Sequence, residues 1–180
     1  MGGNPLRKVL YILGQLSDSD VDWLGRAGQR IKVVKDTQLI TFGVSLSQVY
    51  IVLGGELSVQ TNKGFELAKV SSGEILGEMS LVDSRPPSAS VVVLQDAVVL
   101  ALDKAVLQAK LDLDSGFSSR FYRAIAIFLS ERMRSTVGRM GYGNPSDEAP
   151  TDTDELDENV LDNVHLAGAR FERLLKKLMG

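Results

Sequence analysis

Hydrophobic spacing divides the chain into a helical start, a strand-rich middle and a helical end. Apolar residues at helical intervals, with Ser17 or Ser19 as a candidate cap, predict two short helices within residues 5–28. From about residue 29 to residue 103 the pattern changes to short alternating or β-branched runs: RIKVV, QLITF, QVYIVL, GELSVQ, FELAKV, SASVVVL and AVVLAL. Many short strands separated by turn residues predict a β-sandwich or barrel. The LGGEL segment is interpreted as a tight turn between two strands, because Gly54 and Gly55 tolerate positive φ.

Helical spacing returns after residue 103. Residues 104–111 predict a short helix and residues 115–140 a long one, whose apolar residues fall three or four apart from Phe117 to Val137. Two interpretations of this apolar stripe stay open. It packs on the β-structure, or part of it pairs with a second copy of the chain to form a homodimer.

The last forty residues change character twice. Residues 141–158, GYGNPSDEAPTDTDELDE, combine prolines, glycines and acids without a base, which predicts a flexible, self-repelling linker. The final residues predict an amphipathic helix with basic residues near its C-terminus, where cations suit the helix dipole. We therefore expect a main domain over residues 1–140, an acidic linker over 141–158 and a separate amphipathic helix over 159–180.

Charge and composition argue against several classes of protein. The 180-residue chain has a formal net charge of −3 and no cysteine, so it lacks both the basic balance of a nucleic-acid binder and a disulfide framework. Only an acidic segment and one helix follow the long helix, whereas a helix-turn-helix needs more helices and a basic surface. The apolar stretch near the start is too short and too interrupted for a signal peptide or a membrane span. We expect a cytoplasmic protein that binds neither DNA nor membrane.

An enzyme is not expected either. The single histidine, His165, lies in the tail, so the β-region cannot build a histidine-based metal centre or a Ser-His-Asp triad.

Residues 73–93, GEILGEMSLVDSRPPSASVVV, carry the candidate chemistry. Two Gly-Glu pairs stand four residues apart, and a short helical run, two prolines and a β-branched run follow. The N–H groups at a helix N-terminus suit a phosphate, and Gly77 allows the backbone to approach it closely. Glu78 offers a carboxylate that can accept hydrogen bonds from a ribose hydroxyl, although the same carboxylate also suits the helix dipole without any ligand. The Pro86–Ala89 turn can direct N–H groups and the Ser88 hydroxyl inward.

Together, the β-strands, flanking helices and Gly-Glu motif make residues 5–140 resemble the cyclic-nucleotide-binding domain family. Its phosphate-binding cassette has the form G-E-(L)-A-(L)-(L)-x-x-x-P-R-(A)-A-(T)-V, and residues 77–91 match its spacing from Gly-Glu to the first proline. The resemblance implies a mainly β fold, a β-roll (double-stranded β-helix) with N-terminal helices and a long C-terminal helix. It also implies cAMP or cGMP as ligand, with no metal or other cofactor. The ligand-binding residues that it implies are Gly77, Glu78, Met79, Arg85, Pro87, Ser88, Ala89 and Arg132.

The chain departs from the family pattern at the residue that pairs with the phosphate. The family places an arginine after the first proline, and this chain has Pro87 there. Arg85 precedes the two prolines, and we expect its side chain to swing back towards the phosphate, unless it is only a solvated loop residue. Arg132 lies on the stretch of the long helix that covers the ligand's base in this family.

Two functions therefore stay open. In the first, a non-catalytic regulatory protein binds a cyclic nucleotide and signals through its C-terminal helices to a protein partner. In the second, a degenerate domain has lost the nucleotide and acts as an interaction scaffold. In both, the apolar stripe of the tail helix docks on the partner.

Overall fold

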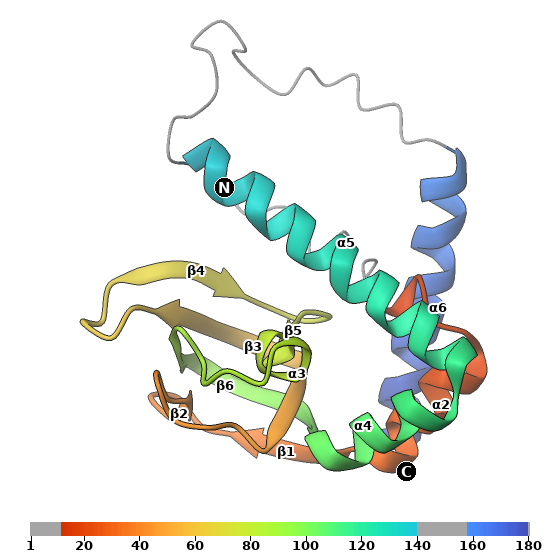
Figure 1. Ribbon diagram of the computed structural model, residues 1–180, viewed down its shortest axis with the longest axis horizontal. Coiled ribbons are helices and arrows are strands. Elements are labelled where there is room, and N and C mark those ends of the chain that lie inside the picture. Colours follow the sequence, from red (N-terminus) through yellow and green to blue (C-terminus); the bar gives the residue numbers. More distant parts are fainter. Residues whose placement is uncertain (1–11, 140–157, 180) are drawn as a thin grey trace, which may run out of the picture.

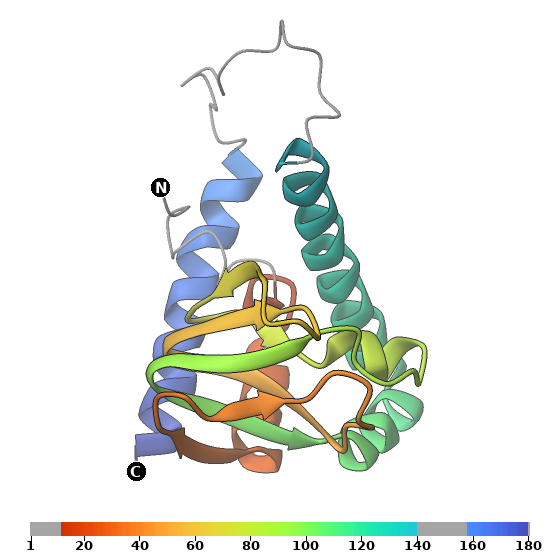
Figure 2. The ribbon, with the colours of Figure 1, turned by 90° about the vertical axis from the view of Figure 1, so that its left-hand side faces the viewer.

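The computed structural model describes residues 12–139 and 158–179. Its six strands form one antiparallel sheet in the order β1-β6-β3-β4, with β2 also paired to β6 and β5 to β3. The sheet curls into a roll on one side of the molecule, and most of the helices gather beside it (Figures 1 and 2). This arrangement confirms the predicted β-roll with flanking helices. The strands are β1 Gln29–Val33, β2 Gln38–Ile40, β3 Gln48–Gln60, β4 Glu66–Val70, β5 Ile75–Leu76 and β6 Ser90–Asp103.

The LGGEL segment is not a turn, and the prediction of a strand exchange there is wrong. Gly54 and Gly55 lie inside β3, which stays paired with β6 along its length while the register shifts between Val52 and Leu57. Gly55 has φ +92°, and a Cβ atom at this position would lie 2.5 Å from the Cβ of Ala97 on β6. The glycines therefore allow close approach at a bulge, which bends the paired strands without ending them. The two runs SASVVVL and AVVLAL are likewise one strand, β6.

Side chains alternate between two cores along β3, as expected for a strand covered on both faces. Val49 and Ile51 point to a core shared with the helices, whereas Tyr50 and Val52 point into the roll. The roll interior is thus lined by apolar side chains of the sheet, and the helices cover the sheet's other face.

The helices are α2 Asp18–Ala27, α3 Glu78–Val82, α4 Lys104–Leu113, α5 Ser115–Arg139 and α6 Glu158–Met179. Ile12 and Leu13 are also helical, and the rest of the first predicted helix lies outside the described residues, as does most of the predicted acidic linker. The first half of the α5 stripe packs in the core, with Phe117 and Phe121 fully buried. Met133, in the second half, is 69% exposed, so pairing with a second copy stays a prediction.

Helix α6 packs against α2. Its Ala167 and Leu174 are fully buried in the core that the helices share with the sheet. Figures 1 and 2 show the two helices side by side, although they lie near opposite ends of the sequence. This contact corrects the expectation that the apolar side of the tail helix is open to a partner, because the chain itself covers that side at Ala167 and Leu174.

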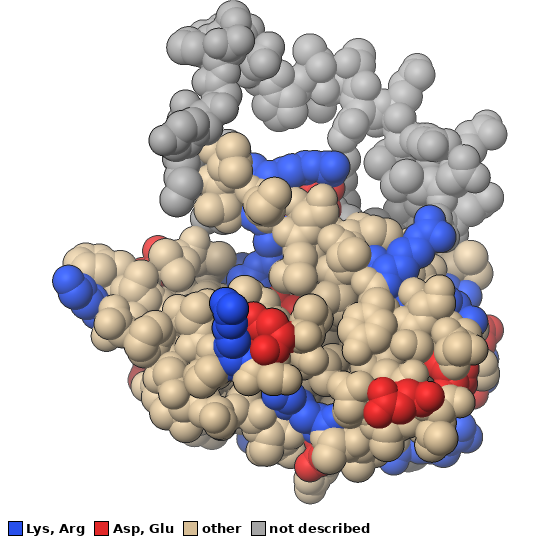
Figure 3. All heavy atoms as spheres, viewed as in Figure 1, with Lys and Arg blue, Asp and Glu red and all other residues tan. Residues whose placement is uncertain are grey.

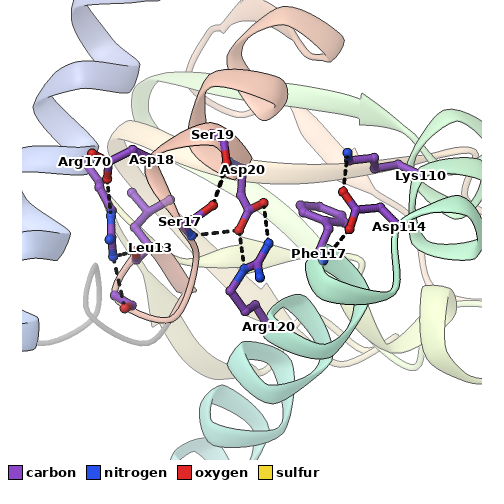
Figure 4. Close-up of polar contacts among 11 residues, drawn as sticks. Leu13, Ser17, Asp18, Ser19, Asp20, Lys110, Asp114, Phe117, Arg120 and Arg170 are labelled. Carbon is purple, nitrogen blue, oxygen red and sulfur yellow. Dashed lines mark hydrogen bonds and ion pairs between the residues drawn. The ribbon is translucent and has the colours of Figure 1, made fainter.

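The first turn of α2 joins three helices through polar contacts (Figure 4). Ser17 and Asp20 form a capping box, in which each side chain accepts a hydrogen bond from the other residue's backbone N–H. The Asp20 carboxylate also accepts bonds from Arg120 of α5, at 2.7 Å from Nε and 3.0 Å from Nη2. Asp18 accepts a 2.8 Å bond from Nε of Arg170 on α6. Nη1 of Arg170 also donates to the backbone carbonyls of Leu13 and Gly14.

Asp20 is only 4% exposed, yet it stays ionised. Burial alone would raise the pKa of its carboxyl, but the bonds from Arg120 and Ser17 lower the pKa below its ordinary value. The pair therefore joins α5 to α2, with its aspartate buried and its arginine partly exposed.

We expect Asp20 and Arg120 to be energetically coupled. In a double-mutant cycle with Asp20→Ala and Arg120→Ala, the coupling energy for unfolding should be about 1 to 3 kcal/mol, because removal of either partner leaves the other without its bidentate contact. Urea unfolding of the four proteins measures it. Effects that add to within about 0.5 kcal/mol would show that the contact does not fix α5 to α2.

Candidate ligand-binding site

The turn from β5 into α3 positions the first candidate residues. Gly77, the N-cap of α3, has φ +84°, a conformation that favours glycine. A Cβ atom at this position would lie 2.5 Å from Cδ2 of Leu46 and 3.2 Å from the carbonyl oxygen of Gln48. Glycine is therefore needed here for conformation and for space. The sharp turn that it allows places Glu78 in the first turn of α3, with its side chain away from water.

A cavity of about 210 Å³ lies between this turn, the roll and α5. Strand residues Ile40, Val59, Leu76 and Val91 give it apolar walls. Each residue predicted for the site lines the cavity, and Ser80, Asp83 and Pro86 line it as well. The structure thus brings together residues from the cassette and from the long helix that are far apart in sequence. An apolar cavity with a few converging polar groups is the usual form of a small-molecule site.

Glu78 is the buried ionisable group of this cavity. It is 3% exposed, and its carboxylate Oε1 lies 3.3 Å from Nη1 of Arg132 on α5. Burial raises the pKa of Glu78 above its ordinary value, and the charge of Arg132 offsets part of that rise. The guanidinium of Arg132 also lies over the ring of Phe128, one turn earlier on α5, at 5.4 Å from the ring centroid. A packed aromatic ring therefore helps to hold Arg132 at the cavity.

Arg85 lies at the rim of the cavity instead. Its side chain is 83% exposed, and its Nε is 3.9 Å from the carboxylate of Asp83. The backbone supports this position, because Ser84 has a positive φ of 59° and the Arg85 N–H donates to Asp83. The inward swing expected of Arg85 is not the arrangement seen in this structure.

Backbone contacts fix the loop that carries Pro87, Ser88 and Ala89. The carbonyl of Pro87 accepts a 2.9 Å bond from the N–H of Gly43. The Ser90 hydroxyl accepts one from the N–H of Phe42 at 3.0 Å. The loop is therefore attached to the turn that follows β2, and Pro87 itself supplies neither a charge nor an N–H to the cavity.

One supporting residue was missed from the sequence. Nζ of Lys104, at the start of α4, donates a 2.7 Å bond to the backbone carbonyl of Ser80 in α3. The contact joins residues 24 positions apart and holds α3 against the end of β6. No local pattern signals it, because Lys104 reads as an ordinary first residue of a helix.

The described residues contain neither a metal-binding cluster nor a membrane-spanning helix. No group of three or more of their His, Cys, Asp and Glu side chains is placed to hold a metal ion. Among these residues, too, no helix has the length and apolar character needed to cross a membrane. On the face drawn in Figure 3, the coloured Lys and Arg side chains are scattered, often beside Asp or Glu, and form no broad basic stripe.

Comparison with known proteins shows which family the strands and the turn at Gly77 resemble. Residues 30–114 match the family model of the cyclic nucleotide-binding domain. The chain is 27% identical over 106 residues to the Pycsar effector protein XpPycTIR of Xanthomonas perforans, a match that covers 58% of this chain and 35% of that protein. The chain thus spans about a third of the length of this curated relative.

Two solved structures illustrate the similarity of fold. A cyclic nucleotide-binding domain from Methylobacillus flagellatus is 27% identical, with a TM-score of 0.68 over 76% of this chain and 83% of that one. The regulatory domain of Toxoplasma gondii PKA, crystallised with cAMP, is 25% identical, with a TM-score of 0.50 over 61% of this chain and 45% of that one. The family match runs from β1 through the turn at Gly77 to the end of α4, and this part of the chain belongs to the cyclic nucleotide-binding domain family.

Proposed function

We propose that the chain is a non-catalytic regulatory protein that binds a cyclic mononucleotide, cAMP or cGMP, in the cavity beside α3. The observation that carries this proposal is the buried carboxylate of Glu78 at the wall of an otherwise largely apolar cavity. A buried carboxylate is costly unless hydrogen-bond donors reach it, and ribose hydroxyls are such donors. The co-crystal of the related PKA regulatory domain with cAMP supports the same class of ligand.

In this proposal different cavity residues contact different parts of the ligand. Glu78 accepts hydrogen bonds from the ribose, and the apolar walls, with Met79 at the edge, suit the base. The small side chains of Ser88 and Ala89 leave room for the cyclic phosphate, towards which the Ser88 hydroxyl can donate.

We further propose that the C-terminal helices pass the ligand signal to a protein partner. Arg132 links the cavity to α5, and the first turn of α2 links α5 to α6 through Asp20 and Asp18. A ligand that changes the position of α5 thereby changes the support of α6.

Hydrogen exchange of the α6 amides should change when the nucleotide is added, and unchanged exchange at saturation would count against this route.

A nucleotide-free scaffold is the alternative function. Pro87 favours it, because the cassette has no cation at the family's phosphate-binding position. The domain would then hold its partner whatever nucleotide is present.

Calorimetric titration with cAMP and cGMP decides between the two functions. We expect binding of at least one nucleotide, weakened about ten- to a hundred-fold by Glu78→Ala, since a hydrogen bond to a charged group is worth roughly 1.5 to 3 kcal/mol. Glu56→Ala is the matched control, because Glu56 pairs with Lys69 on the surface and does not line the cavity. The absence of heat and of a thermal shift at millimolar nucleotide would contradict the sensor and favour the scaffold.

The raised pKa of Glu78 predicts a pH-dependent stability. In the unfolded chain its carboxyl ionises near the ordinary value of 4.5, but in the folded chain it ionises at higher pH. The folded state is therefore favoured by the neutral carboxyl below pH 4.5, and this contribution is lost as pH rises through the folded pKa.

The Glu78→Gln variant has no carboxyl to ionise at this position. The free energy of unfolding of the variant minus that of the natural protein should rise with pH above 4.5, as urea unfolding of both proteins at a series of pH values will show. A difference that stays constant or falls would place the folded pKa of Glu78 at or below its ordinary value.

A further inference from the structure

Two arginines line the cavity, and they differ in position. The Arg132 side chain is 35% exposed and contacts the buried Glu78, whereas the Arg85 side chain is 83% exposed beside Asp83. A positive charge acts most strongly on a ligand where water is largely excluded. Arg132 is therefore the better placed of the two to act on an anion inside the cavity.

The Glu78–Arg132 contact has the character of an exchangeable pair. Its 3.3 Å separation is longer than the 2.7 to 2.9 Å of a strong charge-assisted hydrogen bond. Moving the guanidinium away without replacement would leave a buried carboxylate without its cation, which is strongly unfavourable. A ligand that takes Arg132 must therefore also bring a hydrogen-bond donor to Glu78.

A cyclic nucleotide meets both conditions. Its ribose hydroxyl donates to Glu78, and its phosphate carries the negative charge that replaces Glu78 as the partner of Arg132. A neutral nucleoside offers the hydroxyls and no anion, so its binding would leave Arg132 where it is. The same exchange attaches the ligand to α5, because Arg132 belongs to that helix.

We propose that Arg132 on α5, rather than Arg85 in the cassette, is the residue that binds the ligand's phosphate, with Glu78 releasing it to the ligand. This inference rests on the proposed function. The family pattern has a cation where this chain has Pro87, and in this proposal a helix far along the chain supplies it instead.

The test compares charged and neutral ligands on the full chain. Calorimetry would give the affinities of the natural protein, Arg132→Gln and Arg85→Gln for cAMP and adenosine, and for cGMP and guanosine. We expect the natural protein to prefer the cyclic nucleotide to its nucleoside by about ten- to a hundred-fold. Arg132→Gln should lose this preference and still bind the nucleoside, and Arg132→Lys should keep part of it. Arg85→Gln should keep the preference.

Arg134→Gln is the matched control, since Arg134 lies two positions further along α5, is exposed and does not line the cavity. Retained nucleoside binding by Arg132→Gln shows that the variant is folded with its cavity intact. Should Arg132→Gln fail to fold, the other two variants still test the inference. It would be overturned if Arg132→Lys kept the full preference for the cyclic nucleotide over its nucleoside while Arg85→Gln lost that preference. A natural protein that binds nucleotide and nucleoside equally would also overturn it. Failure to bind either ligand would instead remove the proposed function itself.

Discussion

Glu78 is an ionisable group inside a folded protein, and its partner comes from another element. Arg132 of α5 lies 3.3 Å from the carboxylate, and both residues line a cavity whose remaining walls are mostly apolar. A buried carboxylate without such a partner would favour its neutral form or destabilise the fold. The contact therefore joins α5 to the cassette, and it makes the charge of the cavity depend on a helix that is not part of the roll.

The same helix is held at its other end by a second ion pair. Arg120, three turns before Arg132, contacts the buried Asp20 of α2, and neighbouring Asp18 contacts Arg170 of α6 (Figure 4). Charges near both ends of α5 thus link the cavity to the last helix of the chain. In the contacts of Arg132 with Glu78 and of Arg120 with Asp20 the carboxylate is buried, so salt screens these two contacts less than it screens a surface pair.

The sequence predicts well where its signals are local. The cassette residues are contiguous, so their common place at the cavity follows from one motif, and period-two alternation marks the strands that wall it. Gly54 and Gly55 mislead because a turn and a bulge need the same conformational freedom, and only the partner strand β6 distinguishes them. Arg132 was placed near the ligand by resemblance, yet its contact with Glu78 spans 54 positions and has no local signature. The covered face of α6 was missed for the same reason, since its partner α2 lies at the other end of the chain.

The central claim is that a cyclic nucleotide occupies this cavity between Glu78 and Arg132. A crystal structure of the protein with bound cAMP or cGMP tests it most directly. The account predicts a ribose hydroxyl on the Glu78 carboxylate and a phosphate oxygen on the Arg132 guanidinium, each at about 2.7 to 2.9 Å. A nucleotide bound elsewhere, or a phosphate held by Arg85 while Arg132 stays on Glu78, would contradict it.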